Sequence, residues 1–283
     1  MAGKQVTELD ALPSFTDNSL LPVHNGAGLK KGLLSQLANY LGTKFSNPNL
    51  LINPDFRVNQ RGSANYTSNG YTVDRWKVNN GTVKPQSNGV SVTLNNKGQF
   101  IQLLENTLSG TYTATIKVTS ITGDCVLFIG SHSLQLNKAG TFTITENGSI
   151  TGISLYKSTA GTCTINVEYI KLEQGSVSTT FVTPDYADEL VKCQRYYMSR
   201  KLRLYGACNV DTILNEDLQY LPQMRIEPTF TKSIDYDKNI VQSSIVFYGS
   251  NSDGYYLYFK STTSSSSSQY ILGITVHADA EIY

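Results

Sequence analysis

The sequence predicts a mainly β protein built of antiparallel sandwiches, with two short helical exceptions. First, its composition is typical of sheets with many turns, since it is rich in Thr, Val, Ile and Asn and includes 18 Tyr and 22 Gly. Second, short stretches that alternate between apolar and polar residues are separated by Asn-Gly and similar turn signals. Third, no helical pattern lies between the stretches within residues 48–176, so a parallel βαβ architecture is not expected there.

The polarity of the chain comes from neutral hydroxyl and amide groups, because only 16% of its 283 residues are charged. A typical soluble domain has about 25%. Lys and Arg number 23 and Asp and Glu 22, which gives a net charge of +1 and no overall field that favours nucleic acid or an anionic membrane. No apolar run is long enough for a membrane-spanning helix, and no signal peptide is recognisable. We therefore expect a folded chain that does not use classical secretion.

Residues 1–47 are expected to form a separate arm. Two Leu-Pro steps disfavour helix, and a turn is predicted at 24–28. One short helix is predicted from leucines at helical spacing, namely Leu33, Leu34, Leu37 and Leu41. Because one leucine stripe is too little core for a domain of this length, the arm either packs on the next domain or is ordered by copies of itself or by another protein.

Residues 48–176 predict an antiparallel β-sandwich. Strand patterns with a period of two occur at 90–94, 112–118, 142–144 and 164–172. Turn signals occur at Asn69-Gly70, Asn80-Gly81, Asn88-Gly89, Ser109-Gly110, Gly123-Asp124, Ala139-Gly140, Asn147-Gly148 and Ala160-Gly161. A spacing of roughly 10–20 residues between turns suits a sandwich.

A linking segment, 177–199, is predicted to contain the second helix. Thr183 is placed to cap this helix and Pro184 to occupy its first position. One face of the helix carries residues at spacings i, i+4, i+7 and i+11, which are Tyr186, Leu190, Cys193 and Tyr197. Basic residues, including Arg200 and Lys201, gather toward its C-terminal end, where the helix dipole favours cations.

Residues 200–283 predict a small C-terminal β-sandwich. Strand patterns return at 245–248, 255–259 and 270–276. The serine run at 264–268 is expected to be an exposed loop tip.

Three stretches, in this order, resemble bacteriophage virion appendage proteins of the tail-fibre and receptor-binding type. The first, 7–31 with 34–37, resembles their N-terminal virion-attachment segment. The second, 49–62 with Tyr71-Thr-Val-Asp-Arg-Trp76 and 169–175, is similar to a galactose-binding-like jelly roll of the carbohydrate-binding-module type. The third, Leu190-Val-Lys-Cys-Gln-Arg-Tyr-Tyr197 with 224–229 and 278–282, resembles their C-terminal tip domain. The chain departs from long fibres in having no room for a shaft.

The resemblance implies an organisation of 1–47 as a virion-attachment segment, 48–176 as a carbohydrate-binding-like jelly roll, 177–199 as linker and helix, and 200–283 as the tip. Within the first segment, the implied attachment residues are Leu20, Leu21, Pro22, Val23 and Asn25. The resemblance also implies a homotrimer, in which the helical face of Tyr186, Leu190, Cys193 and Tyr197 is a candidate threefold contact.

The function implied by the resemblance is non-enzymatic attachment of a virion to a host surface glycan. The implied partners are other tail or collar proteins, which the N-terminus would bind, and a host polysaccharide; neither nucleic-acid binding nor membrane insertion is expected. The location is then the virion, assembled in the host cytoplasm. The alternative is a structural tail or collar adaptor that carries other fibres and binds no glycan.

Glycan binding needs aromatic faces that pack on sugar rings and polar groups that bond their hydroxyls. The candidate residues are Trp76, Tyr256, Tyr258, Asn251 and Asp253. Trp76 has an alternative role as a core anchor beside an Asp74–Arg75 ion pair. In 255–259, one face carries Tyr255, Leu257 and Phe259 and the other Tyr256 and Tyr258; one of these faces is core, and the other is either a ligand platform or a subunit interface.

No residue pattern predicts an enzyme, a metal site or a cofactor. His24, His132 and His277 are far apart, and no Cys-x-x-Cys pair, Gly-x-Ser-x-Gly motif or phosphate-binding glycine loop occurs. Cys125 and Cys163 could pair across the sandwich, but assembly in a cytoplasm favours free, buried thiols.

Overall fold

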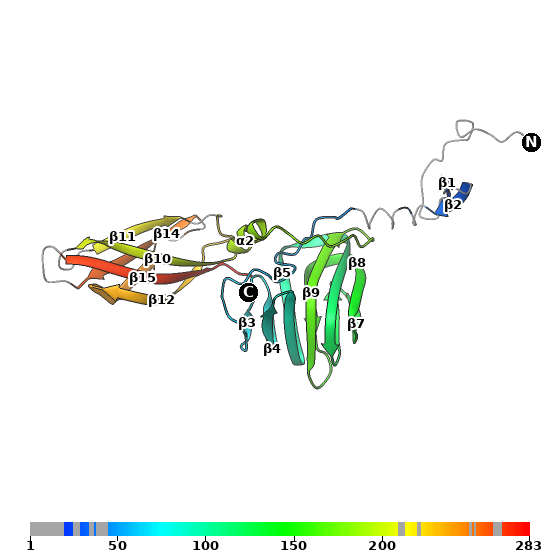
Figure 1. The fold of residues 1–283 in the computed structure, drawn as a ribbon, viewed down its shortest axis with the longest axis horizontal. Helices are drawn as coiled ribbons and strands as arrows, with labels where there is room; N and C mark the ends of the chain where they lie inside the picture. The colour runs from blue at the N-terminus through cyan, green and yellow to red at the C-terminus, as the bar shows by residue number, and fades with distance from the viewer. Residues whose placement is uncertain are drawn as a thin grey trace, which may run out of the picture.

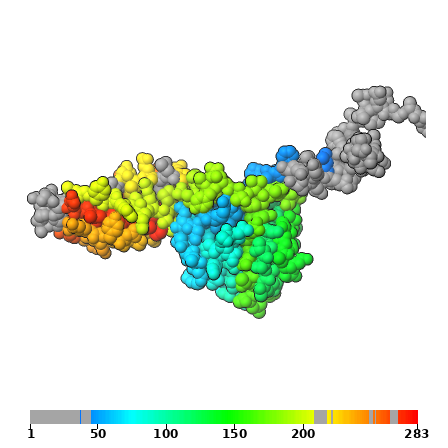
Figure 2. All heavy atoms as spheres, in the orientation of Figure 1, coloured from blue at the N-terminus to red at the C-terminus, as the bar shows by residue number. Residues whose placement is uncertain are grey.

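The computed structural model describes residues 20–24, 29–33, 37, 45–208, 213–219, 222–248, 251, 253–262 and 268–283. These residues form antiparallel sheets and one assigned helix, α2 (Tyr186–Gln194). Two β units lie end to end with α2 at their junction (Figure 1). Figure 2 shows the first as a compact body and the second as a narrower extension of it. The prediction of a mainly β protein with antiparallel sandwiches is confirmed.

The described part of the N-terminal arm is a β-hairpin. Its strands, β1 (Leu20–His24) and β2 (Leu29–Leu33), pair from Leu20 with Leu33 to His24 with Leu29. Leu33 therefore ends a strand, and the prediction that it begins a helix is wrong, because cross-strand pairing overrides the leucine spacing. Leu37 is helical. Asn25, Leu34 and Leu41 lie outside the described residues.

The first sandwich, defined here as residues 49–174, contains seven strands. They are β3 (Gly70–Tyr71), β4 (Lys77–Gln86), β5 (Gly89–Thr122), β6 (Cys125–Ile129), β7 (His132–Leu136), β8 (Gly140–Tyr156) and β9 (Cys163–Gln174). The first and last parts of β5 both pair with β9. The middle part of β5 pairs with the C-terminal part of β8, and this part of β8 also pairs with β6. The long strand β5 thus passes from one layer of the sandwich to the other and back.

Several predicted turns lie inside strands. Ser109 and Gly110 belong to β5 and face Ser149 and Gly148 of β8. Asn80 and Gly81 lie in β4 at a bulge, where Asn80 has a φ of 48°. A Cβ on Gly81 would lie 2.5 Å from the carbonyl oxygen of Thr93, so this glycine allows a close approach of two strands rather than a reversal of the chain.

Trp76 is a core residue, so the prediction that it binds ligand is wrong. Its side chain is fully buried, and its ring stacks on Phe100 at a centroid distance of 4.9 Å and packs against Phe56 at 5.1 Å. Its indole N–H donates to the carbonyl oxygen of Asn53 at 2.9 Å. An indole that packs in this way, with its one polar atom bonded, anchors the core of the first sandwich.

Helix α2 is shorter than predicted. Its cap is Asp185 and not Thr183, because the Asp185 carboxylate accepts hydrogen bonds from the N–H groups of Ala187 and Asp188 at 2.8 and 3.2 Å. The helix ends at Gln194, because Tyr197 already begins strand β10 and pairs with Asp279. Cys193 and Tyr197 are buried within the chain. They do not form an exposed stripe with the more accessible Tyr186 and Leu190. The prediction of a threefold contact through Cys193 and Tyr197 is therefore wrong.

The second sandwich, defined here as residues 197–283, consists of two three-stranded sheets. One has the order β10 (Tyr197–Cys208), β15 (Ser268–Asp279), β12 (Thr229–Lys238), and the other β11 (Ile213–Gln219), β14 (Gly254–Ser261), β13 (Ile240–Tyr248). A second hydrophobic cluster fills it, including Leu257, Phe259, Leu272 and Ile274. Arg200 and Lys201, which were expected near the end of the helix, lie in β10.

The C-terminal residues return to the first sandwich and bind it through buried charges. Arg75 pairs with Glu281, and both side chains are almost fully buried. The sequence had predicted an ion pair between Arg75 and Asp74, and this prediction is wrong. The guanidinium of Arg75 lies 3.6 Å from the ring centroid of Tyr196. The Tyr71 hydroxyl donates to the carbonyl oxygen of Ile282. These contacts join the two sandwiches.

Asp74 is the buried acid of this junction. Its carboxylate accepts hydrogen bonds from the backbone and side-chain nitrogens of Gln60 at 3.1 and 2.5 Å, and it lies 3.6 Å from Arg61. Arg61 in turn lies 3.7 Å from the ring centroid of Tyr197. Burial outweighs these favourable contacts and raises the pKa of Asp74 to about 6.

Candidate functional site

The candidate site begins with strand β14 at the centre of its sheet. The side chains of Tyr255, Leu257 and Phe259 are buried, whereas Tyr256 is 41% exposed and Tyr258 is half-buried. The alternation expected along 255–259 is confirmed, with the face of Tyr256 and Tyr258 pointing away from the core. The strand is held in register by β11, where Asp217 faces Tyr256.

The turn between β13 and β14 supplies the amide and one carboxylate that the sequence had selected. The side-chain oxygen of Asn251 accepts hydrogen bonds from the N–H groups of Asp253 and Gly254 at 2.7 and 2.9 Å. Asn251 thus closes the turn with its own side chain, as asparagine commonly does. The carboxylate of Asp253 accepts a hydrogen bond from the amide of Gln223 at 2.6 Å. These bonds fix both side chains relative to the start of β14.

A hollow of about 150 Å³ brings these residues together. Its lining includes Asn251 and Asp253 from the turn, Tyr256 from β14, and Asp217 and Gln219 from the end of β11. An exposed aromatic ring therefore stands beside two carboxylates and two amides. Tyr258, two residues further along β14, shares the outward face but does not line the hollow.

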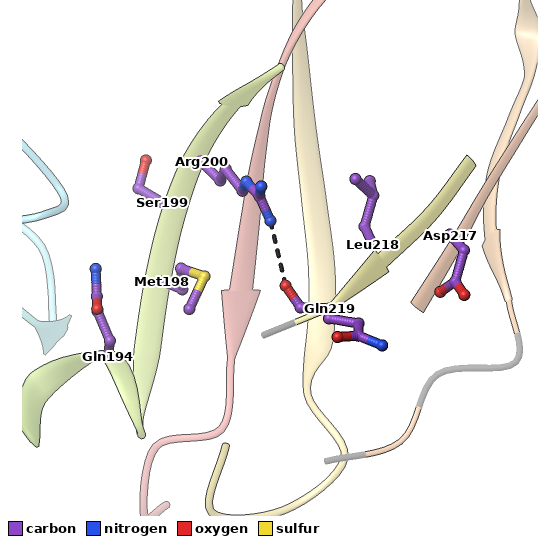
Figure 3. A pocket seen from close by; sticks show the side chains of 7 residues that line it. All are labelled: Gln194, Met198, Ser199, Arg200, Asp217, Leu218 and Gln219. Atoms are coloured by element: carbon purple, nitrogen blue, oxygen red, sulfur yellow. Dashed lines mark hydrogen bonds between the residues drawn. The ribbon is translucent and has the colours of Figure 1, made fainter. Parts of the chain in front are cut away.

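A larger hollow of about 560 Å³ adjoins the first, because Asp217 and Gln219 line both. Its other walls come from the end of α2 and from β10, including Met198 and Arg200 (Figure 3). One guanidinium nitrogen of Arg200 donates to the carbonyl oxygen of Gln219 at 3.2 Å, which joins β10 to β11 across the hollow. The two hollows thus adjoin each other at the end of β11.

The structure thus gathers three of the five predicted ligand-binding residues, Tyr256, Asn251 and Asp253, around one hollow. It also adds Asp217 and Gln219 to that hollow and Arg200 to the adjoining one, and sequence reasoning missed all three. Asp217 and Gln219 lie in a stretch without a clear strand pattern, and Arg200 had been assigned to the helix. In β11, the apolar Leu218, which is half-buried, lies between the polar residues Asp217 and Gln219. This local alternation was the one signal that could have placed Asp217 and Gln219 on a common face.

The first sandwich carries a separate hollow of about 360 Å³ on the layer formed by β5, β8 and β6. Its lining includes Phe128 and Tyr156, whose rings meet edge to face at a centroid distance of 6.0 Å, together with Gln99, Thr151 and Ser154. This aromatic and polar surface is a second position at which a neutral ligand could bind, and the sequence had not selected it.

Metal-ligand chemistry finds no support in the described part of the chain, where no cluster of three or more His, Cys, Asp or Glu side chains could hold an ion. Cys125, Cys163 and Cys193 are buried and unlinked, and burial raises the pKa of the Cys193 thiol above its ordinary range. No helix in the described ranges is long and apolar enough to cross a membrane.

Comparisons with known proteins leave the family of the chain open. No protein-family model and no curated protein sequence matches it. Among solved structures, wild-type discoidin II from Dictyostelium discoideum aligns with a TM-score of 0.23 and 8% identity over 65% of this chain and 77% of that one. The native structure of recombinant discoidin II aligns with a TM-score of 0.24 and 8% identity over 67% and 80%. Likeness this low carries no functional argument.

Proposed function

We propose that the protein binds a surface glycan through the outward face of β14 and the hollow beside it. The observation that carries this proposal is the position of Tyr256 next to two carboxylates and two amides. An aromatic ring can pack on the apolar face of a sugar while oxygens and N–H groups bond its hydroxyls. The proposal involves binding alone and assigns the residues no catalytic step.

The expected test result is a loss of binding when the ring is removed. Tyr256→Ala should weaken binding to an array of bacterial surface polysaccharides by about tenfold, equivalent to about 1.4 kcal/mol. Because Tyr256 is 41% exposed, the variant should fold normally. Tyr205→Ala is the matched control, since Tyr205 is 83% exposed and lies on the other sheet.

The same array locates the site within the chain. A Phe128→Ala variant removes a ring from the hollow of the first sandwich and should leave binding unchanged. If Phe128→Ala abolished binding while Tyr256→Ala did not, the site would belong to the first sandwich and the assignment to β14 would be wrong.

We further propose that this binding serves attachment of a phage particle to its host, with residues 1–47 holding the protein on the virion. The support is the resemblance of 7–31, 49–62 and 190–197 to tail-fibre proteins. In a homotrimer, several weak glycan sites would act together and raise the overall affinity. The alternative, a structural adaptor without a glycan site, shares the same N-terminal role.

Deletion of residues 1–47 is expected to abolish incorporation into virus particles and to leave glycan binding intact. Immunoblots of purified particles measure the first effect, and the polysaccharide array measures the second. Particles that still contain the shortened chain would contradict the attachment role. The adaptor alternative would be favoured if the full chain entered particles but bound neither host cells nor any polysaccharide.

A further inference from the structure

Arg200 has an unusual position for an exposed arginine. It lies in β10 between Met198 and Leu202, which share its side of the strand and are both 7% exposed. Its side chain reaches over the 560 Å³ hollow toward β11 (Figure 3). The strand therefore directs a cation along the wall of a hollow rather than outward from the sheet.

Two neighbouring cations, Arg195 and Lys201, are paired with carboxylates, whereas Arg200 is not. Arg195 lies 2.8 Å from Glu105, and Lys201 lies 3.3 Å from Asp235. Among the carboxylates whose side chains the structure describes, none lies within ion-pair distance of Arg200, although Asp217 lines the same hollow. Its hydrogen bond to the Gln219 carbonyl oxygen at 3.2 Å uses one of the five N–H donors of a guanidinium. That bond also orients the planar group, which leaves further donors for an oxyanion.

The hollow of Arg200 adjoins the glycan site. Asp217 and Gln219 separate it from the hollow of Tyr256 and line both. A volume of about 560 Å³ falls within the range of known small-molecule sites. A chain of sugars that extends from Tyr256 past Asp217 and Gln219 would therefore enter the hollow of Arg200.

We propose that the glycan bound at Tyr256 is acidic, and that Arg200 binds the oxyanion of the adjoining sugar, a carboxylate or a phosphate. This inference rests on the proposed glycan binding and adds the class of glycan. Arg200 is then the residue that selects acidic over neutral polymers, while Tyr256 contributes to the binding of both. The net charge of +1 does not oppose this, because the selection is made by one oriented group and not by an overall field.

The test compares acidic oligosaccharides with matched neutral ones on the full-length protein. One set contains uronate oligosaccharides and their carboxyl-reduced counterparts, and the other contains phosphorylated oligosaccharides and their dephosphorylated counterparts. The wild-type protein should bind the acidic member of one set about tenfold more tightly, and this preference should weaken as salt is raised. The set that shows the preference identifies the oxyanion.

Arg200→Gln should abolish the preference for the acidic member, because it removes the oriented guanidinium. Lys201→Gln is the matched control, because it removes the same charge from the adjacent residue, whose side chain is 60% exposed and pairs with Asp235. That control should retain the preference. Equal thermal unfolding temperatures of the two variants show that folding is intact.

Three results would overturn the inference. Equal binding of acidic and neutral members, with loss of both in Tyr256→Ala, would refute the role of Arg200 and leave the proposed glycan binding in place. Binding to no member of either set would refute both. A preference that survives in Arg200→Gln and is lost in Lys201→Gln would assign the oxyanion to the opposite face of β10.

Discussion

Replacement of Trp76 by alanine is expected to destabilise the first sandwich by about 3–5 kcal/mol, the range for removal of a large buried aromatic side chain. The ring is fully buried against Phe56 and Phe100, so its loss leaves a cavity that the two remaining rings cannot fill. The carbonyl oxygen of Asn53 also loses the indole N–H that it accepts at 2.9 Å. For a chain of this size the unfolding temperature should fall by about 10 °C.

Trp76 is the only tryptophan in the chain, so the variant has no tryptophan fluorescence with which to follow unfolding. Circular dichroism or calorimetry therefore measures this change. Val182→Ala is a suitable control, because Val182 is 64% exposed. The unfolding temperature of this variant should lie within about 1 °C of that of the wild type. If Trp76→Ala bound glycan more weakly at full stability, a surface role for this residue would have to be reconsidered.

The second large effect concerns the pH dependence of stability at Asp74. Burial raises the pKa of this group from 3.8 to about 6 in the folded state. A raised pKa means that the contribution to stability is fully present below pH 3.8 and is lost as pH rises through about 6. The loss amounts to about 3 kcal/mol, because one pKa unit corresponds to about 1.4 kcal/mol.

Asp74→Asn removes this titration and keeps the shape of the side chain. The wild type loses stability as pH rises, whereas the variant does not. The free energy of unfolding of the variant, minus that of the wild type, should therefore rise by about 3 kcal/mol between pH 4 and pH 8. Denaturant unfolding at several pH values measures the difference, and any pH-independent cost of the amide cancels from it. A difference for Asp74→Asn that stays constant over this range would contradict the assigned pKa.

Much of the β structure follows from local pattern. Alternation along 164–172 and 255–259 predicted which side chains share a face. The structure buries one of these faces in each strand, including Ile165, Val167, Leu257 and Phe259. Successive side chains of a strand point to opposite faces whatever the strand pairs with. Such alternation can therefore be recognised without knowledge of the partners.

The candidate site depended on contacts that no local pattern contains. Asp217 meets Tyr256 because β11 and β14 pair across almost 40 residues of chain, and Arg200 reaches the site from a third strand. Such pairing is decided by the packing of the whole sandwich, so sequence reasoning could select Tyr256, Asn251 and Asp253 but could not select their neighbours. For the same reason it left Trp76 undecided between ligand platform and core.

The sequence by itself determined that this protein is an antiparallel β protein with little charge, and that β14 has one apolar and one tyrosine-bearing face. Those are properties of composition and of the two-residue period of a strand. Only the tertiary structure decided where α2 ends, because pairing of β10 with β15 takes Tyr197 and Arg200 out of the helix. It also decided that Trp76 is core, that Asp217 lies beside Tyr256 and that Arg200 lines the adjoining hollow, because burial and long-range pairing belong to the assembled fold.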